Sequence, residues 1–125
     1  MEIKVSPGVK SRVFPALFAF PALFAFIRTV LYSERLSDWA THIWLCRCEG
    51  ICESDAKIIC LGLCGTQTKT ELLFLHEVAH ALRDGIDAVD SYWHRDNWTA
   101  EFHRLCRHYL GELKLSAREL RAIFI

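Results

Sequence analysis

The residues from His76 to His80 have the types and spacing of a metal-dependent hydrolase site. They form the pattern H-E-x-x-H, with Glu77 directly after the first histidine. On a helix, residues four positions apart share one face, so both imidazoles can bind one Zn²⁺ ion. The carboxylate beside them can then remove a proton from a zinc-bound water, as a general base. The pattern predicts His76 and His80 as zinc ligands and Glu77 as the catalytic residue.

The segment that carries this pattern is predicted to be a buried helix. The stretch GTQTKTELLFLHEVAHALRDG has a capping box at Thr68 and Glu71, and Arg83 with Gly85 indicates its end. Between residues 72 and 82, the helix itself carries apolar side chains on almost all of its sides. Two histidines and a glutamate buried there without a ligand would cost several kcal/mol, so the apolar setting favours an occupied metal site.

A catalytic zinc site needs a third protein ligand and one open position. We expect His94 to be that ligand, because it stands where a loop enters the next predicted helix. Glu101 on that helix and Asp87 or Asp90 in the loop remain alternatives. The metzincin continuation, with glycine and histidine three and six residues after His80, is absent, which excludes that class.

The stretches before and after the motif also contain recognisable patterns. The strand-like stretch GICESDAKIICLGL precedes ELLFLHEVAHAL, and WHRDNWTAEFHRLCRHYLG follows after a gap. Together these stretches, over roughly residues 45–111, resemble the SprT-like zinc metallopeptidases. In that family an H-E-x-x-H helix is followed by a histidine and then by an aromatic residue on the next helix.

The resemblance implies a zincin-like fold and peptidase activity on protein or peptide substrates. It implies that His76, His80 and His94 are the zinc ligands, that Glu77 is the catalytic acid/base, and that Trp98 is the packing aromatic residue.

Two features depart from the family pattern. Trp93 and Arg95 flank His94, where glycines are common in the family. We find no match to the family's common C-terminal zinc ribbon, an element that could bind DNA. The Spartan proteases of this family digest proteins crosslinked to DNA, and we see no counterpart of the DNA-binding parts on which that activity depends.

The remaining patterns predict an α+β domain. A helix is expected over residues 21–32, and an amphipathic helix over residues 97–110 is ended by Gly111. Between them, HIWLCRC and AKIICLGL predict two neighbouring strands or a β-hairpin, with EGICESD as a turn. Ser116 begins a short terminal helix.

The first part of the chain differs in composition from the rest. Residues 1–30 combine a basic start with an uncharged run from Val13 to Ile27, and the resemblance implies that residues 31–125 form the SprT-like domain. The run is shorter than the ~20 apolar residues that span a bilayer, so a helix packed on the core is favoured. A signal peptide, or a membrane anchor over residues 13–32, remains an alternative.

Charge and cysteine content limit the partners and the compartment. Fifteen basic residues balance fifteen acidic ones, so no overall field attracts nucleic acid or an anionic membrane. A local contact with nucleic acid is still an alternative. It would involve the basic residues of the predicted helix 97–110, which are His103, Arg104, Arg107 and His108. The six cysteines include no C-x-x-C pair, which predicts reduced thiols and a cytoplasmic location. We expect the Cys46–Cys64 cluster to consist of buried thiols rather than a second metal site.

The hypothesis from the sequence is a small monomeric zinc metallopeptidase. It would hydrolyse peptide bonds through a zinc-bound water activated by Glu77. The alternative is a binding module in which zinc only braces the fold through a fourth protein ligand, associated with DNA or anchored to a membrane. Such a module would have no coordinated water.

Overall fold

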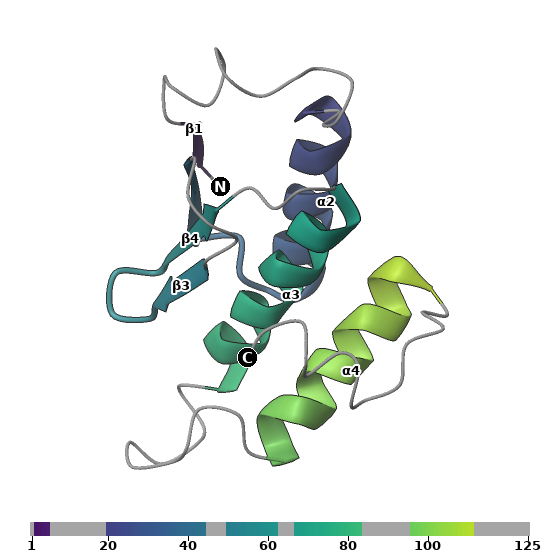
Figure 1. Cartoon of the computed structure of the whole chain (residues 1–125). Helices are drawn as coiled ribbons and strands as arrows, with labels where there is room; N and C mark the ends of the chain where they lie inside the picture. The colour runs from purple at the N-terminus through teal and green to yellow at the C-terminus, as the bar shows by residue number, and fades with distance from the viewer. Residues whose placement is uncertain (1, 6–19, 45–49, 63–66, 84–95, 112–125) are drawn as a thin grey trace.

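The computed structural model of the chain describes residues 2–5, 20–44, 50–62, 67–83 and 96–111 (Figure 1). In chain order the elements are β1 (Ile3–Val5), α2 (Phe20–Ser33), β2 (Ala40–Trp44), β3 (Gly50–Glu53), β4 (Ile58–Gly62), α3 (Gln67–Arg83) and α4 (Asp96–Leu110). Within the described residues these elements make a four-stranded sheet and three helices, so the α+β class predicted from the sequence is confirmed.

The strands form one mixed sheet in the order β1-β2-β4-β3. β1 runs parallel to β2, and β2 runs parallel to β4. β3 runs antiparallel to β4, with Gly50 opposite Leu61 and Glu53 opposite Ile58. β3 is therefore the edge strand beside β4.

The sheet corrects one expectation from the sequence and adds a strand that no pattern predicted. The stretch EGICESD, which was expected to be a turn, contains strand β3, and the turn of the β3–β4 hairpin lies at residues 54–57. In that turn the Lys57 amide donates to the Ser54 carbonyl at 3.2 Å, and Lys57 has a φ of 54°. The sequence also gave no indication of β1. The two neighbouring strands expected after residue 42 are present as β2 and β4.

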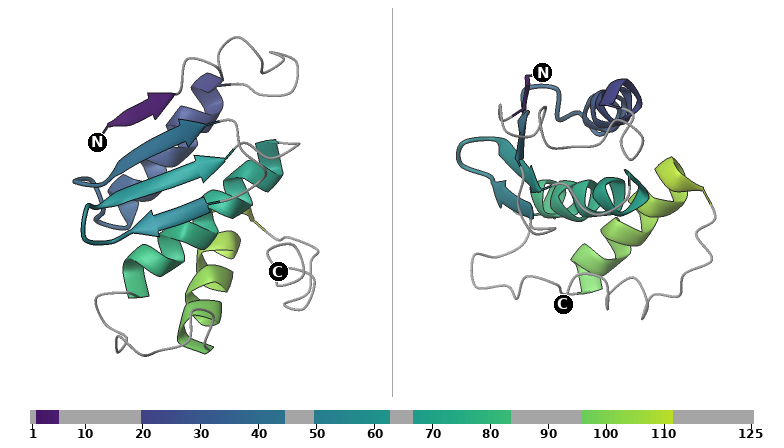
Figure 2. Two further views of the ribbon diagram at one scale, coloured as in Figure 1. Left: turned by 60° about the vertical axis from the view of Figure 1, so that its left-hand side comes forward. Right: turned by 45° about the horizontal axis from the view of Figure 1, so that its top comes forward.

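All three helices lie on one side of the sheet (Figure 2). α3 packs against β3, β4 and α2, and α4 packs on the outer side of α3. The core between them is built from large apolar side chains that are fully buried, including Leu23, Ile27, Leu31, Ile43, Ile59, Leu61, Phe74, Leu75, Phe102 and Leu105. α3 is therefore covered on several sides, as its apolar sequence predicts.

α2 confirms the helix expected over residues 21–32. Leu23, Ile27, Val30 and Leu31 are fully buried and form its inner face. Phe26 meets Phe74 of α3 edge to face, with ring centroids 6.2 Å apart. Among the described residues, no helix is both long enough and apolar enough to cross a membrane.

α3 and α4 lie close to their predicted positions. α3 already begins at Gln67, so Thr68 lies in its first turn and does not act as the cap expected of it. Glu71 instead accepts a hydrogen bond from Gln67 at 3.1 Å. α4 ends before Gly111, whose φ of 74° is the left-handed conformation that glycine favours after a helix.

Several expectations concern residues outside the described ranges. They include His94, Asp87, Asp90, Gly85, Cys46, Cys48, Cys64 and the terminal helix from Ser116.

Candidate metal and catalytic site

The two histidines of the motif lie side by side on α3. The ring centroids of His76 and His80 are 5.0 Å apart, with an angle of 68° between the ring planes. Only 6% of His76 is exposed, whereas His80 near the end of the helix is partly exposed. The structure therefore places both imidazoles on one helix face, as their spacing predicts.

Glu77 is buried between α3 and the edge of the sheet. The residue is 4% exposed, and its Oε1 lies 3.7 Å from Nε2 of His76. Its side chain also lies directly against Gly50, the first residue of β3. A buried carboxylate is stabilised where a cation or hydrogen-bond donors face it, so its position beside the histidine pair is compatible with a metal site.

Two aromatic residues of α4 close the other side of the histidine pair. The Trp98 ring lies 4.7 Å from that of His76 and stacks on His80 at 5.3 Å. Phe102 stacks on Trp98 at 5.1 Å and meets His76 edge to face at 5.9 Å. Trp98 Nε1 also donates a hydrogen bond to the His76 carbonyl at 3.4 Å. Trp98 is therefore buried and packs against both histidines, as a packing aromatic residue would.

Of the four candidates for a third ligand, only Glu101 lies within the described residues. His94 lies outside the described residues, as do Asp87 and Asp90. Glu101 is described, and it accepts a hydrogen bond from Nε of Arg104 at 3.0 Å. Over the described ranges, no three His, Cys, Asp or Glu side chains are grouped so that they could hold a metal ion.

The described side chains are suited to zinc in their chemistry. His76 and His80 offer imidazole nitrogens from adjacent turns of one helix, which is a common arrangement for two zinc ligands. The buried carboxylate of Glu77 beside them would be stabilised by a divalent cation. One further donor from outside the described residues would complete a three-ligand site.

The described cysteines do not group with the histidine pair into a cluster that could hold a metal ion. Cys52, Cys60 and Cys106 are free thiols. Burial raises the pKa of Cys60, and the negative charges of Glu53 and Glu77 raise it further. Burial also raises the pKa of Cys106 to about 12. For Cys60 and Cys106, the prediction of buried thiols is confirmed.

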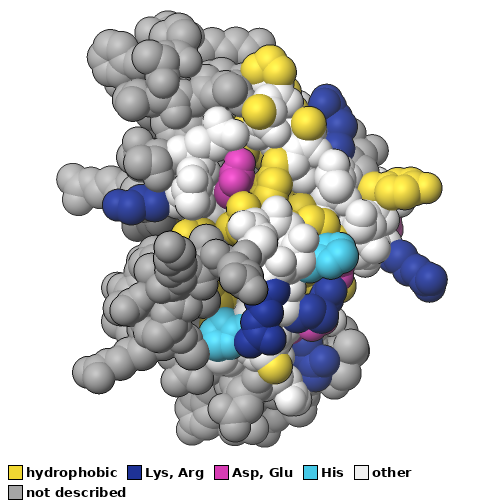
Figure 3. All heavy atoms as spheres, turned by 90° about the vertical axis from the view of Figure 1, so that its right-hand side faces the viewer, with side chains coloured by type: hydrophobic (Ala, Val, Ile, Leu, Met, Phe, Trp, Pro, Cys, Tyr) yellow, Lys and Arg dark blue, Asp and Glu magenta, His cyan; other side chains and the backbone are white. Residues whose placement is uncertain are grey.

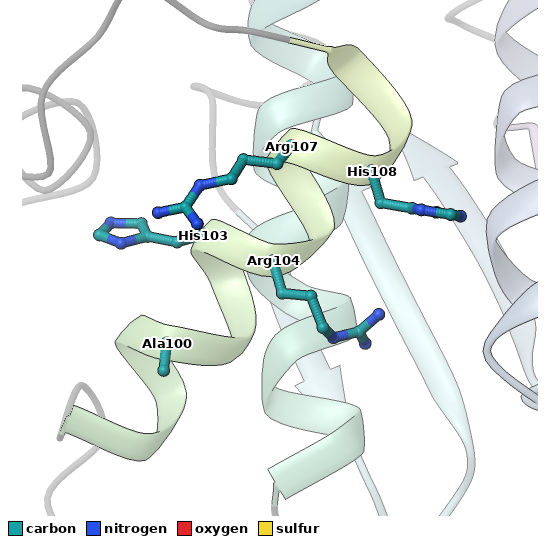
Figure 4. A pocket seen from close by; sticks show the side chains of 5 residues that line it. All are labelled: Ala100, His103, Arg104, Arg107 and His108. Carbon is teal, nitrogen blue, oxygen red and sulfur yellow. The ribbon is translucent and has the colours of Figure 1, made fainter.

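The basic residues of α4 surround a shallow hollow of about 610 Å³ on the outer face of the helix. Figure 3 shows Arg and His side chains gathered on the side of the molecule where α4 lies. In Figure 4, His103 and Arg107 point to one side of the helix, and Arg104 and His108 point to the other. Arg104 is also paired with Glu34 and Glu101. The four side chains therefore do not converge on one ligand position.

The site includes one residue that the sequence patterns did not single out, namely Gly50. The stretch around it was interpreted as a turn, where a glycine needs no further explanation. A glycine at the start of a strand often marks a close approach of another group to the backbone, and that signal applies here. Only the fold shows that the approaching group is Glu77.

Comparison with known proteins adds no assignment. No family model, no curated protein and no solved structure matches the chain. The function is therefore inferred from the residues of the site.

Proposed function

We propose that the protein is a zinc-dependent metallopeptidase of the SprT-like kind with a zincin-like fold. His76 and His80 hold the metal, His94 is the third ligand, and Glu77 is the general base. One observation carries the proposal: a buried carboxylate lies 3.7 Å from the first of two adjacent imidazoles, on a helix packed against the sheet. Two imidazoles and a carboxylate placed together in this way are the side chains that a catalytic zinc site requires.

Each side chain has a separate task in the proposed reaction. Zinc, when bound, lowers the pKa of water and polarises the peptide carbonyl that is attacked. Glu77 accepts a proton from the attacking water and then passes it to the departing amine as the peptide bond breaks. Its burial keeps the carboxylate out of bulk water, which strengthens its interaction with nearby charges. Trp98 and Phe102 keep the imidazoles in place.

The proposal is tested by separating metal binding from hydrolysis. The variant Glu77→Gln keeps the shape of the side chain but removes the base, so it should bind zinc like the parent and lose hydrolysis by about 10²–10⁴-fold. His76→Ala and His80→Ala should lose both properties. Zinc content is measured by elemental analysis, and hydrolysis with unfolded casein and a quenched fluorescent peptide library.

A matched control comes from the same helix. Glu71→Gln makes the same chemical change at a carboxylate that bonds Gln67, and it should keep both zinc and activity. If Glu77→Gln cleaved substrate as fast as the parent, the assigned mechanism would be wrong. A parent protein that binds zinc through four protein ligands and cleaves nothing would be the zinc-braced binding module instead.

A further inference from the structure

Gly50 and Glu77 are in unusually close contact across the interface between sheet and helix. A methyl group on Gly50 would lie 2.8 Å from Cγ of Glu77, 2.9 Å from Oε1 and 3.0 Å from the carboxylate carbon. Carbon atoms in good contact are about 3.5–4.0 Å apart, so no side chain fits between the two residues as they stand. The absence of a side chain at position 50 is what lets the strand approach the carboxylate.

Neither backbone can easily move away from this contact. Gly50 is paired with Leu61 across the β3–β4 ladder, and β3 packs against α3. Glu77 lies in the buried middle of α3, between Phe74 and Val78, which are both fully buried. A side chain added at position 50 would therefore displace the Glu77 side chain before it displaced either element.

The contact limits the positions open to the carboxylate oxygen. Oε1 of Glu77 is one of the three atoms that a methyl group on Gly50 would meet, and the same atom lies 3.7 Å from Nε2 of His76. The backbone of β3 at Gly50 therefore lies on one side of this oxygen, and the imidazole of His76 lies on another. A carboxylate pushed away by a side chain at position 50 could not keep its distance from His76.

We propose that Gly50 is a positioning residue. Because it has no side chain, its backbone can lie against Glu77 and hold the carboxylate at the observed distance from His76. The inference rests on the proposed function, because that function makes Glu77 the base. Gly50 touches no reacting atom, and it acts only through the conformation of Glu77. Its φ lies outside the left-handed region, so alanine at this position meets the Glu77 side chain without meeting backbone strain.

The test substitutes Gly50→Ala and measures hydrolysis, zinc affinity and thermal unfolding. Displacement of a catalytic group by about 1 Å can cost about 100-fold in rate, so kcat should fall by that order while KM changes little. Zinc affinity should stay at the parent level, because the clash falls on Glu77 and leaves the two imidazoles in place. The Tm should fall, because the new methyl group has no room.

Shortening the opposing side chain gives a test that does not depend on activity. In Glu77→Ala the space beside Gly50 is empty, so adding Gly50→Ala to that variant should leave the Tm unchanged or raise it. Glu77→Asp removes one methylene and should rescue part of the Tm lost in Gly50→Ala. The control Ile51→Ala alters the neighbouring β3 residue, which is 46% exposed. It should change the Tm by the same amount in the parent protein and in the Glu77→Ala variant.

Each outcome decides a separate question. If Gly50→Ala lowers the Tm by the same amount in the parent protein and in the Glu77→Ala variant, the new methyl group clashes with another residue. The inference is then overturned. It is also overturned if Gly50→Ala keeps the parent kcat, or if the double variant Gly50→Ala/Glu77→Ala fails to fold. If the parent shows no hydrolysis, the proposed function fails, and the Tm coupling still decides whether Gly50 sets the position of Glu77.

Discussion

The indole of Trp98 stacks on the imidazole of His80, with ring centroids 5.3 Å apart and an angle of 28° between the planes. The same indole lies against His76 and donates a hydrogen bond to its carbonyl. One residue of α4 therefore contacts both histidines of α3. Because Trp98 is only 5% exposed, the two helices must be docked for the imidazoles to keep this arrangement.

Replacing this residue should weaken both the fold and the metal site. Trp98→Ala removes a buried ring and should lower the free energy of unfolding by about 3–5 kcal/mol. Zinc affinity should fall by about 10–100-fold, as when groups that orient metal ligands are lost. Trp98→Phe keeps an aromatic contact and should lose less of each. Urea unfolding and zinc competition with a chromophoric chelator measure the two effects, and unchanged zinc affinity in Trp98→Ala would contradict the orienting role.

Removing the proposed zinc ion should lower the stability of the fold without unfolding the chain. The core of α2, α3 and the sheet is apolar and contains no predicted ligand other than His76, so it should hold the fold by itself. A ligand at 100 times its Kd stabilises the folded state by about 2.7 kcal/mol, and adding EDTA should remove a stabilisation of that order. His80→Ala should show the same Tm with and without zinc. Unfolding by EDTA at room temperature would instead support the zinc-braced module.

The helices of this fold were predictable because their signals are local. In α2, α3 and α4 the apolar residues recur at helical spacing, and Gly111 marks the end of α4. The pairing of His76 with His80 follows from the same geometry, since a spacing of four residues fixes both on one face. These predictions required no knowledge of any other part of the chain.

The sheet and its contact with the site were less predictable because they depend on distant residues. β1 has three residues, too few for a periodic pattern, and it becomes a strand by pairing with β2. β3 contains Gly50 and Glu53, which are poor strand formers, and pairing with β4 outweighs that preference. The contact between Gly50 and Glu77 joins residues that no local pattern connects.

The thiols of the described core should react slowly with alkylating reagents. Burial raises the pKa of Cys60 and of Cys106, so little of the reactive thiolate is present at pH 8. Cys52 on the edge strand is only partly buried, and its Sγ lies 3.6 Å from the Ser54 hydroxyl oxygen. Among these three cysteines, iodoacetamide should therefore modify Cys52 first, as read by peptide mapping over time. Faster labelling of Cys106 than of Cys52 would show that α4 undocks readily.

A polar contact joins the end of α2 to α4 and is expected to depend on pH. Glu34 accepts hydrogen bonds at 2.5 Å from Nη2 of Arg104 and from the Tyr109 hydroxyl. Burial by itself would raise the pKa of Glu34, but the hydrogen bonds from Arg104 and Tyr109 outweigh it and lower the pKa. The contact holds α4 in the position from which Trp98 reaches the histidines.

The direction of the Glu34 shift fixes the pH range in which this contact stabilises the fold. A carboxyl group whose pKa is lowered by folding adds stability above its unfolded value, and this stability is lost as the pH falls through the folded value. Glu34→Gln should therefore cost about 1–3 kcal/mol at pH 7, and the difference from the parent should shrink as the pH drops below about 4.5. Tyr109→Phe keeps the Arg104 pair and should cost less. Urea unfolding from pH 7 to pH 3 measures both variants, and a Glu34→Gln deficit that stays constant over this range would show that the carboxylate charge does not hold α4 in place.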